Sequence, residues 1–527
     1  MPRIERIERI KTIQQPGRTA VVTPRSALML IALMPAIAAT HAAAQPTPAA
    51  VAEQGEVTQF IVKLKAPQAG AMTSGDGARE SQAAVSVLEH AVARALGERQ
   101  DPHSRVRRSS DAVRYTREMS GAAHVVGLSA SVAHEYAAEL AKRIEAQPEI
   151  EYAQPDYRVY AQLEPGDPLY SQQWAYHHPR GGANANKAWN ATTGSTTVVT
   201  AVVDTGYRMH ADLAANMLPG YDFISDPFGA NDGDGRDPDA SDPGDWVTLE
   251  ELPQCGMTLG GVTDSTWHGT HVAGTIGAIA NNETGGVGMN WQGRILPVRV
   301  LGKCGGRVSD IIDGIRWAAG LPVPHVPANA HPAKIINVSL GSSVPCGGGT
   351  QEAIDDVIKK GVSVVAAAGN SNDEVGQPAS CRGVIAVAAI DEVGDKAPFS
   401  NYGARVDIGA PGMDIVSTAN SGATVPDEES YISYNGTSMA APHVAGTVGL
   451  MLAVNPALTP DAIRAKLRSS ARPYREGSIC AKNSAGALCG AGILDAARAV
   501  ESAMPMADAS PMADASPLPN AMADASR

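Results

Sequence analysis

Ser438 is the residue whose surroundings are most suggestive of chemistry. It lies in the motif GTSMA (436–440), directly before an apolar run that extends to Leu452. A serine at the start of a helix lies near backbone N–H groups that have no partner within the helix, where negative charge is stabilised. Flanking glycine and alanine would let a substrate backbone approach, so Ser438 is a candidate nucleophile for acyl transfer. Taken alone, a helix N-cap is the better explanation.

Two possible partners lie upstream. The β-branched, apolar run 198–203 is typical of a parallel strand buried on both faces, and it ends at Asp204. Open α/β sheets place their sites at the carboxyl ends of such strands, although a turn or helix cap also explains an aspartate there. His268 opens a small-residue helix, HGTHVAGT. The spacing of His268 and His271 could suggest zinc, but no glutamate follows His268 as a zinc-protease helix requires.

The chain order Asp204, His268, Ser438, within the motifs DTG, HGTH and GTSMA, resembles the three signatures of the subtilisin-like serine endopeptidases. Because three matches occur in the family's order, a catalytic role explains these residues better than the structural role that each would have alone. The resemblance implies that Ser438 attacks the scissile carbonyl, His268 transfers the proton and Asp204 orients the imidazole. His271 and His443 are expected to have structural roles.

The resemblance also implies an oxyanion hole and a substrate cleft. The apolar run 362–368 ends beside Asn370, whose side-chain amide would bind the oxyanion together with the backbone N–H of Ser438. The loop 371–379 is expected to form part of the S1 pocket, with broad specificity. The expected substrate-binding residues are Ser339, Gly341, Ala367 and Gly369.

Structural calcium is the expected cofactor, because hard cations take several oxygen ligands and the family has such sites. A second candidate site lies in an acidic insertion, 225–246, which a solvated loop explains equally well. By resemblance, the ligands of the first site would be Asp167, Asp212 and Asn282 with the carbonyls of Ala280, Thr284 and Gly286. Those of the second would be Asp232, Asp234 and Asp237.

Apolar strands alternate with helical patterns after about residue 167, which predicts an α/β fold, a parallel sheet flanked by helices on both faces. Before it, a strand at 59–65, a helix at 131–146 and an acidic strand at 148–156 predict a small α+β domain. This domain resembles the family's inhibitory propeptide; an independent binding domain is the alternative. We expect a signal peptide at 1–44, the propeptide at 45–162, the catalytic domain at 163–502 and a low-complexity tail at 503–527.

The chain ends and the charge bear on location and partners. Arg18 and Arg25 precede a short apolar run, 27–34, and the small residues at 42–44 offer a cleavage site, so the protein is expected to be secreted without a stable membrane anchor. The formal net charge of -13 provides no basic surface for nucleic acid. We expect a monomer that acts on proteins or peptides and is inhibited by its own propeptide.

Six cysteines in an exported chain suggest three disulfides, for which 15 pairings exist, with free thiols as the weaker alternative. We favour sequential pairing: Cys255 with Cys304, Cys346 with Cys381, and Cys480 with Cys489.

Two rival functions come from other classes. A catalytically silent, peptide-binding relative would need a change in the triad or the oxyanion residues, and the sequence contains none. An esterase of the α/β-hydrolase type would need a G-x-S-x-G elbow, which is absent around Ser438.

Overall fold

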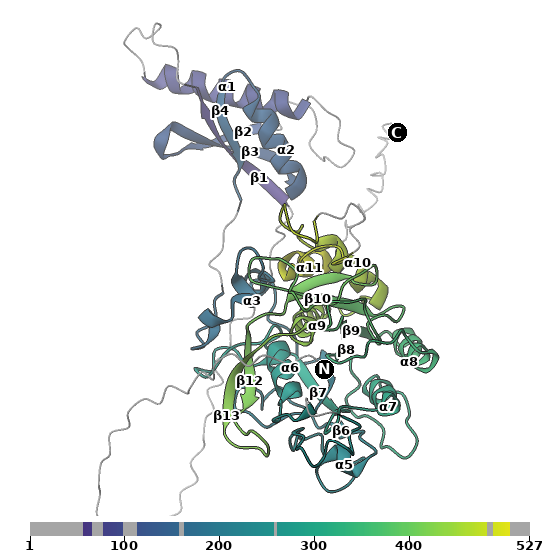
Figure 1. Cartoon of the computed structure of the whole chain (residues 1–527). Coiled ribbons are helices and arrows are strands. Elements are labelled where there is room, and N and C mark those ends of the chain that lie inside the picture. Colours follow the sequence, from purple (N-terminus) through teal and green to yellow (C-terminus); the bar gives the residue numbers. More distant parts are fainter. Residues whose placement is uncertain are drawn as a thin grey trace, which may run out of the picture. The chain divides into compact units, whose positions relative to one another are not determined.

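The computed structural model describes residues 56–65, 77–97, 113–157, 163–257, 261–481 and 488–505. They form two compact units, one within 56–157 and one within 163–505 (Figure 1). The expected signal peptide, the boundary at residue 162 and the tail beyond residue 505 lie outside the described residues.

The first unit has an α+β fold around a four-stranded antiparallel sheet in the order β2-β3-β1-β4. Phe60 and Val62, alternate residues of β1, are fully buried in a core shared with both helices. The sequence predicted β1, α2 and β4 but not β2, whose side chains are mostly exposed, nor β3. The elements are β1 Glu56–Leu64, α1 Gly77–Gly97, β2 Val113–Glu118, η2 Ser120–Ala122, β3 Ala123–Ala133, α2 His134–Glu145 and β4 Ile150–Pro155.

The second unit is built on a seven-stranded sheet in the order β11-β10-β9-β8-β5-β7-β6, in which all neighbouring strands are parallel. The α/β architecture expected from the sequence is therefore confirmed. The strands are β5 Val199–Asp204, β6 Tyr221–Asp222, β7 Arg294–Arg299, β8 Ile335–Val338, β9 Ser363–Ala367, β10 Ile385–Ile390 and β11 Ile408–Pro411. A separate antiparallel hairpin consists of β12 Ile415–Asn420 and β13 Glu429–Tyr434.

Helices cover both faces of this sheet (Figure 1). In β5, Val202 belongs to the core under α6 and α9, whereas Ala201 and Val203 belong to the core under α7 and α8. This two-sided burial explains why the strand is a continuous apolar run. The helices are η3 Tyr170–Gln172, α3 Trp174–His177, α4 Ala185–Ala188, α5 Pro227–Ala230, α6 His268–Gly277, α7 Val308–Ala318, α8 Gly348–Lys359, α9 Thr437–Val454, α10 Pro460–Ser470 and α11 Ala496–Ala503.

Helix α9 is the central helix of this unit. By length and composition it could cross a membrane, but 83% of it is buried inside the fold. It packs against α6 and against strands β8 to β11, so its apolar composition reflects its place in the core.

Strand β5 marks the point at which the strand order reverses. The chain proceeds from β5 to β6 and β7 on one side of it, and then from β8 to β11 on the other. In open α/β sheets, ligands bind outside the carboxyl ends of the strands at such a point. The register places Val203 opposite Val338, so Asp204 and Ser339 come next on adjacent strands.

The acidic insertion is held to the sheet by Arg299, the last residue of β7. This side chain is fully buried. Its guanidinium donates to Asp222, to Asp232 Oδ2 at 2.5 Å and to the carbonyl oxygen of Ala230. Burial raises the pKa of Asp222 to about 7, against the opposing effect of the Arg299 charge. The Arg299 guanidinium therefore pairs with one carboxylate of the sheet, Asp222, and with one of the insertion, Asp232.

We expect Arg299→Met to lower the free energy of unfolding by about 3–5 kcal/mol, because it leaves Asp222 buried without its cation. Urea denaturation followed by intrinsic fluorescence would measure the loss. The control is Arg316→Met on α7, which breaks a pair with Asp356 at the surface. That change should cost no more than about 1 kcal/mol. Equal losses in the two variants would contradict the prediction.

Candidate functional site

Asp204 and His268 are in direct contact. Asp204 is the last residue of β5, and His268 is the first residue of α6. The Nδ1 atom of His268 lies 2.7 Å from Asp204 Oδ1, and both residues are buried. The same carboxylate oxygen accepts a hydrogen bond from the backbone N–H of Thr205 at 2.8 Å. The end of β5 thus fixes the position of the Asp204 carboxylate, and this carboxylate in turn fixes the Nδ1 side of the His268 imidazole.

The surroundings make this imidazole more basic than usual. Burial alone would lower the pKa of His268, but the charge and hydrogen bond of Asp204 raise it. Asp245 and Asp242, both from the acidic insertion, raise it further, and the pKa of His268 lies above its usual value. Neither of these two aspartates was singled out from the sequence. A basic, oriented imidazole of this kind can accept a proton from a nearby hydroxyl group.

Ser438 is the second residue of α9 and is held against the end of β8. Its hydroxyl donates to the carbonyl oxygen of Ser339 at 3.0 Å, and the Ser339 hydroxyl donates to the Ser438 carbonyl oxygen at 2.8 Å. Because Ser339 follows β8 as Asp204 ends β5, these bonds place Ser438 at the same edge of the sheet. Among the described residues, no hydrogen bond joins the Ser438 hydroxyl to His268.

Thr437 fixes the side-chain amide of Asn370. Asn370 Oδ1 accepts hydrogen bonds from the backbone N–H of Thr437 at 2.9 Å and from its hydroxyl at 2.8 Å. The Thr437 hydroxyl also accepts from the backbone N–H of Gly369 at 3.0 Å. With its oxygen so occupied, Asn370 keeps Nδ2 for another acceptor. Sequence reasoning missed Thr437, although a hydroxyl directly before the candidate nucleophile is the signal that could have found it.

Gly369 is a position where only glycine fits. Its φ is +112°, and a Cβ atom there would lie 2.4 Å from Asn401 Nδ2. Asn401 Oδ1 accepts hydrogen bonds from the backbone N–H groups of Ser371 at 2.8 Å and Asp373 at 3.1 Å. Asn401 therefore organises the loop that follows Asn370, a further residue that the sequence did not indicate.

The expected cleft residues lie at the carboxyl ends of two adjacent strands. Ser339 follows β8, and Ala367 ends β9. The segment that contains Gly341 contacts the loop 371–379, because the backbone N–H of Ser342 donates to the carbonyl oxygen of Gln377 at 3.0 Å. The structure therefore brings these cleft residues to one edge of the sheet.

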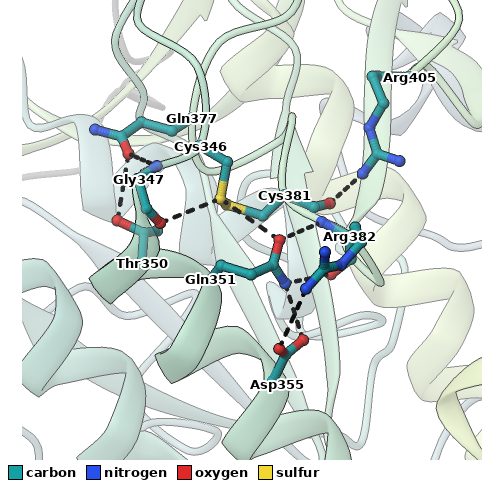
Figure 2. Close-up of a disulfide and its surroundings, with 9 residues drawn as sticks. All are labelled: Cys346, Gly347, Thr350, Gln351, Asp355, Gln377, Cys381, Arg382 and Arg405. Carbon is teal, nitrogen blue, oxygen red and sulfur yellow. Dashed lines mark hydrogen bonds and ion pairs between the residues drawn. A yellow bond between two sulfur atoms is a disulfide. The ribbon is translucent and has the colours of Figure 1, made fainter.

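The six cysteines pair in the sequential order favoured from the sequence, as Cys255–Cys304, Cys346–Cys381 and Cys480–Cys489. Figure 2 shows the second bridge, which joins Cys346, just before α8, to Cys381, just after the loop 371–379. Gln351 of α8 reinforces it by accepting from the backbone N–H of Arg382 at 2.8 Å. Gln377 Oε1 accepts from the backbone N–H of Gly347 at 3.1 Å. The bridge thus ties the segment that follows the loop 371–379 to the start of α8.

Two expected calcium ligands, Asp167 and Asp212, are buried carboxylates that meet the same loop. Asp167 accepts from the backbone N–H of Asn281 at 2.7 Å, and Asp212 Oδ1 accepts from the Asn282 side-chain amide at 2.7 Å. Burial raises the pKa of Asp212 to about 7, and the charge of Asp167 also raises it. No salt bridge joins either carboxylate to a cationic side chain of the described residues. Two buried carboxylates suit a hard cation. Asn282 directs its amide N–H towards Asp212, and its Oδ1 accepts from the backbone N–H of Thr284 at 2.9 Å.

The second candidate site is not assembled in this way. Asp232 pairs with Arg299, and Asp237 Oδ1 accepts from the backbone N–H of Asp239 at 2.6 Å. Within the described part of the chain, no group of three or more His, Cys, Asp or Glu side chains could hold a metal ion. Asp232 and Asp237 thus take part in the folding of the insertion. Asp234 lies near both, because its backbone N–H donates to Asp232 Oδ1 at 3.3 Å and its charge, after burial, raises the pKa of Asp237.

His271 and His443 make structural contacts. His271 Nε2 lies 2.9 Å from the carbonyl oxygen of Ile415 and 3.1 Å from that of Ile432, which ties α6 to the hairpin. His443 Nδ1 lies 2.8 Å from the carbonyl oxygen of Met439 within α9. Burial lowers the pKa of His271 to about 3 and that of His443 to about 4, so both imidazoles are neutral near pH 7.

Comparison with known proteins identifies two relatives of similar sequence and one solved structure of similar fold. The chain is 50% identical over 336 residues to an extracellular protease of Xanthomonas campestris pv. campestris, covering 63% of this chain and 57% of that protein. It is 44% identical over 331 residues to an extracellular basic protease of Dichelobacter nodosus, covering 60% and 54%. A solved protease structure from Pseudoalteromonas arctica, 48% identical, matches with a TM-score of 0.61 over 65% of this chain and all of that chain.

The chain spans a little over half the length of the two curated relatives. The sequence profile of the subtilase family, peptidase S8, matches residues 195–492, a range that includes Asp204, His268 and Ser438. Because this match covers more than half of the chain, the chain belongs to the subtilase family.

Proposed function

We propose that this protein is a secreted serine endopeptidase that hydrolyses peptide bonds through an acyl-enzyme. The observation that carries the proposal is the buried 2.7 Å contact between Asp204 and His268 at the strand edge where Ser438 is held. The names of the two relatives, both extracellular proteases, support the reaction and the secretion.

In the first half of the reaction, Ser438 Oγ attacks the scissile carbonyl carbon and its proton passes to His268 Nε2. Asp204 holds the proton on Nδ1 and stabilises the imidazolium that forms. The tetrahedral intermediate collapses as the C–N bond breaks, and His268 gives its proton to the leaving amine. Water then attacks the ester by the same route in reverse, releasing the acid and restoring the Ser438 hydroxyl.

Negative charge develops on the carbonyl oxygen in both halves of the reaction. Asn370 Nδ2 and the backbone N–H of Ser438 are the proposed donors to it. Thr437 orients the first of them through the two hydrogen bonds to Asn370 Oδ1. Because the amide is oriented before the substrate arrives, little reorganisation is needed as the charge forms.

Proteins and peptides are the proposed substrates. Ser339, Gly341, Ala367 and Gly369 would contact the substrate main chain and the S1 pocket, where small residues leave the backbone accessible. The loop 371–379, braced by the Cys346–Cys381 bridge, would form one wall of S1. Specificity is proposed to be broad.

The N-terminal unit is proposed to be an inhibitory propeptide, consistent with its separate compact α+β fold before residue 163. It would assist folding and then be removed near residue 162. The tail from residue 503 would lie outside the catalytic domain, 163–502, and the mature enzyme is proposed to act as a monomer.

A structural calcium ion is the proposed cofactor. Asp167, Asp212 and Asn282, with the carbonyl oxygens of Ala280, Thr284 and Gly286, would hold it. Bound there, the ion would neutralise two buried carboxylates and tie the start of the catalytic domain to the loop 280–286.

Treatment of the purified, secreted protein with a serine-directed phosphonate should give an adduct on Ser438 and a mature N-terminus near Leu163. Both would be read by mass spectrometry. Asp204→Asn should lower kcat by about 10⁴, since the imidazole would lose its orienting carboxylate. Correctly folded, processed protein without an adduct would reject the mechanism.

In the pH profile of kcat/KM, the midpoint of the acidic limb should lie above pH 6.5. His268 must be neutral to accept the proton, and its pKa is raised from the usual value of 6.5. Activity is therefore lost as the pH falls through that raised pKa. Initial rates on a peptide substrate across a pH series would measure the limb, and a midpoint at or below 6.5 would disagree with the site's electrostatics.

Thr437→Val removes the hydroxyl that donates to Asn370 and accepts from Gly369. The lost hydrogen bond to Asn370 costs about 0.5–1.5 kcal/mol, so kcat should fall about two- to twelvefold with little change in KM. Thr437→Ser keeps the hydroxyl and serves as the control. A change in KM alone would argue against a role in orienting the oxyanion donor.

Chelation of calcium with EDTA should lower the temperature of irreversible thermal inactivation, because Asp167 and Asp212 would regain their mutual repulsion. Differential scanning fluorimetry with and without added calcium would follow the shift. Asp212→Asn should remove most of the response. An unchanged inactivation temperature on chelation would remove calcium from the proposal.

A further inference from the structure

Asp242, in the acidic insertion, is linked to the residue directly after His268. Its Oδ2 atom accepts the hydroxyl hydrogen of Thr205 at 2.7 Å. Thr205 Oγ1 in turn accepts the backbone N–H of Gly269 at 3.0 Å. The two bonds form a chain from the insertion, through the residue that follows Asp204, to the first turn of α6.

Asp245 holds the other side of the same segment. Its Oδ1 atom accepts from the backbone N–H of Thr266 at 2.6 Å, and its Oδ2 atom accepts from the Thr266 hydroxyl at 2.8 Å. Thr266 lies two residues before His268, and its carbonyl oxygen accepts from the Tyr434 hydroxyl at 2.6 Å. The segment 266–269 is thus bonded directly to Asp245 at one end and linked to Asp242 through Thr205 at the other.

Gly244 allows one insertion to supply both carboxylates. Its φ is +109°, and a Cβ atom there would lie 2.3 Å from the carbonyl oxygen of Thr424. Its backbone N–H donates to Asp242 Oδ1 at 2.9 Å. The turn at Gly244 therefore directs Asp242 towards Thr205 and Asp245 towards Thr266.

We propose that Asp242 and Asp245 are positioning residues for His268, which hold its segment from both sides and place two more negative charges beside the imidazole. This inference rests on the endopeptidase function proposed above. It assigns to the acidic insertion a role in setting the basicity of the general base.

The charges around His268 are predominantly negative. Asp204, Asp245 and Asp242 all raise its pKa, and the neighbouring His271 is neutral. The acidic groups that face the segment 266–269 are Asp204 from β5 and Asp242 and Asp245 from the insertion. The other titratable groups are His271 from α6 and Tyr434 from β13. Two cationic side chains, Arg208 and Arg299, lie near Asp242.

Asp242 is itself sensitive to pH. Burial and the charge of Asp245 raise its pKa to about 7, whereas the hydrogen bonds from Thr205 and Gly244 favour its anion. Its charge is therefore partly lost near neutrality. Burial raises the pKa of Asp245 as well, although the hydrogen bonds from Thr266 favour its anion.

The test is the pH dependence of kcat/KM in the full-length, self-processed enzyme, with rates normalised to active sites titrated by phosphonate. Asp245→Asn should move the acidic limb down by about 0.5 pH unit, because one charge that favours the imidazolium is gone. Asp242→Asn should give a shift in the same direction. Glu250→Gln removes an equal charge from an exposed side chain nearby and should leave the limb in place.

Positioning is tested separately at Thr205. Thr205→Val breaks the link between Asp242 and Gly269 and should lower kcat about tenfold with KM little changed, since only the transition state needs the aligned imidazole. Thr205→Ser keeps the hydroxyl and should restore most of the loss. A purely structural role would move the melting temperature without moving the limb or kcat.

The outcomes separate the two proposals. An active wild-type enzyme, together with an Asp245→Asn variant that keeps the wild-type limb and kcat, would overturn the inference while leaving the function intact. A folded wild-type protein without a Ser438 adduct would reject the function itself. If Asp242→Asn does not fold, Asp245→Asn and the Thr205 pair decide the question.

Discussion

The contact between the Asp204 carboxylate and the His268 imidazole is the interaction to which the surrounding structure is fitted. A carboxylate with no exposed surface is unfavourable unless hydrogen bonds and a positive partner stabilise it. The site satisfies both needs at Oδ1, with a backbone N–H from Thr205 and an imidazole that becomes positive when it takes a proton. The buried Oδ2 atom has no hydrogen-bond partner among the described residues. The energetic cost of burying Asp204 is thus recovered when the imidazolium forms.

The position of this pair follows from the sheet. The strand order reverses at β5, which lies between β7 and β8 in the sheet. Asp204, at the carboxyl end of β5, therefore lies at the point of reversal. The end of β8 delivers Ser339 beside Asp204, and the reciprocal bonds of Ser339 hold the start of α9 there. Because α9 is almost wholly buried, Ser438 has little freedom to move away from this edge. The core of the unit and the geometry of its site therefore depend on the same helix.

Much of this could be predicted from the sequence because the informative residues are local. An apolar run that ends in Asp204, a small-residue helix that begins at His268, and the motif around Ser438 each point to an element and to its end. The parallel sheet and the sequential disulfides are both present in the structure. The metal ligands, the processing point and the tail are still predictions.

What the sequence did not disclose depends on contacts between distant residues. Thr437 orients Asn370 across 67 positions, and Asp242 reaches Thr205 across 37. No periodicity records such pairs, since each residue looks like an ordinary turn or cap residue in its own segment. Asp242 and Asp245 also lie in an acidic run whose composition suggests solvation or metal binding, a pattern that conceals which carboxylates turn inward.

The acidic insertion shows how stability and reactivity are connected here. Arg299 neutralises Asp222 and Asp232 and so fixes the first part of the insertion to β7. Arg236 fixes it to α7 through Asp310 and Asp313. Only Asp242 and Asp245, beyond these anchors, are left to act on the segment that carries His268. The charge of Arg299 also reaches Asp242 and favours its anion, and Arg208 Nη1 donates to the carbonyl oxygen of Asp242 at 3.1 Å. The separation of paired and unpaired carboxylates along one insertion is therefore what allows a buried acidic cluster to be both stable and useful to the imidazole.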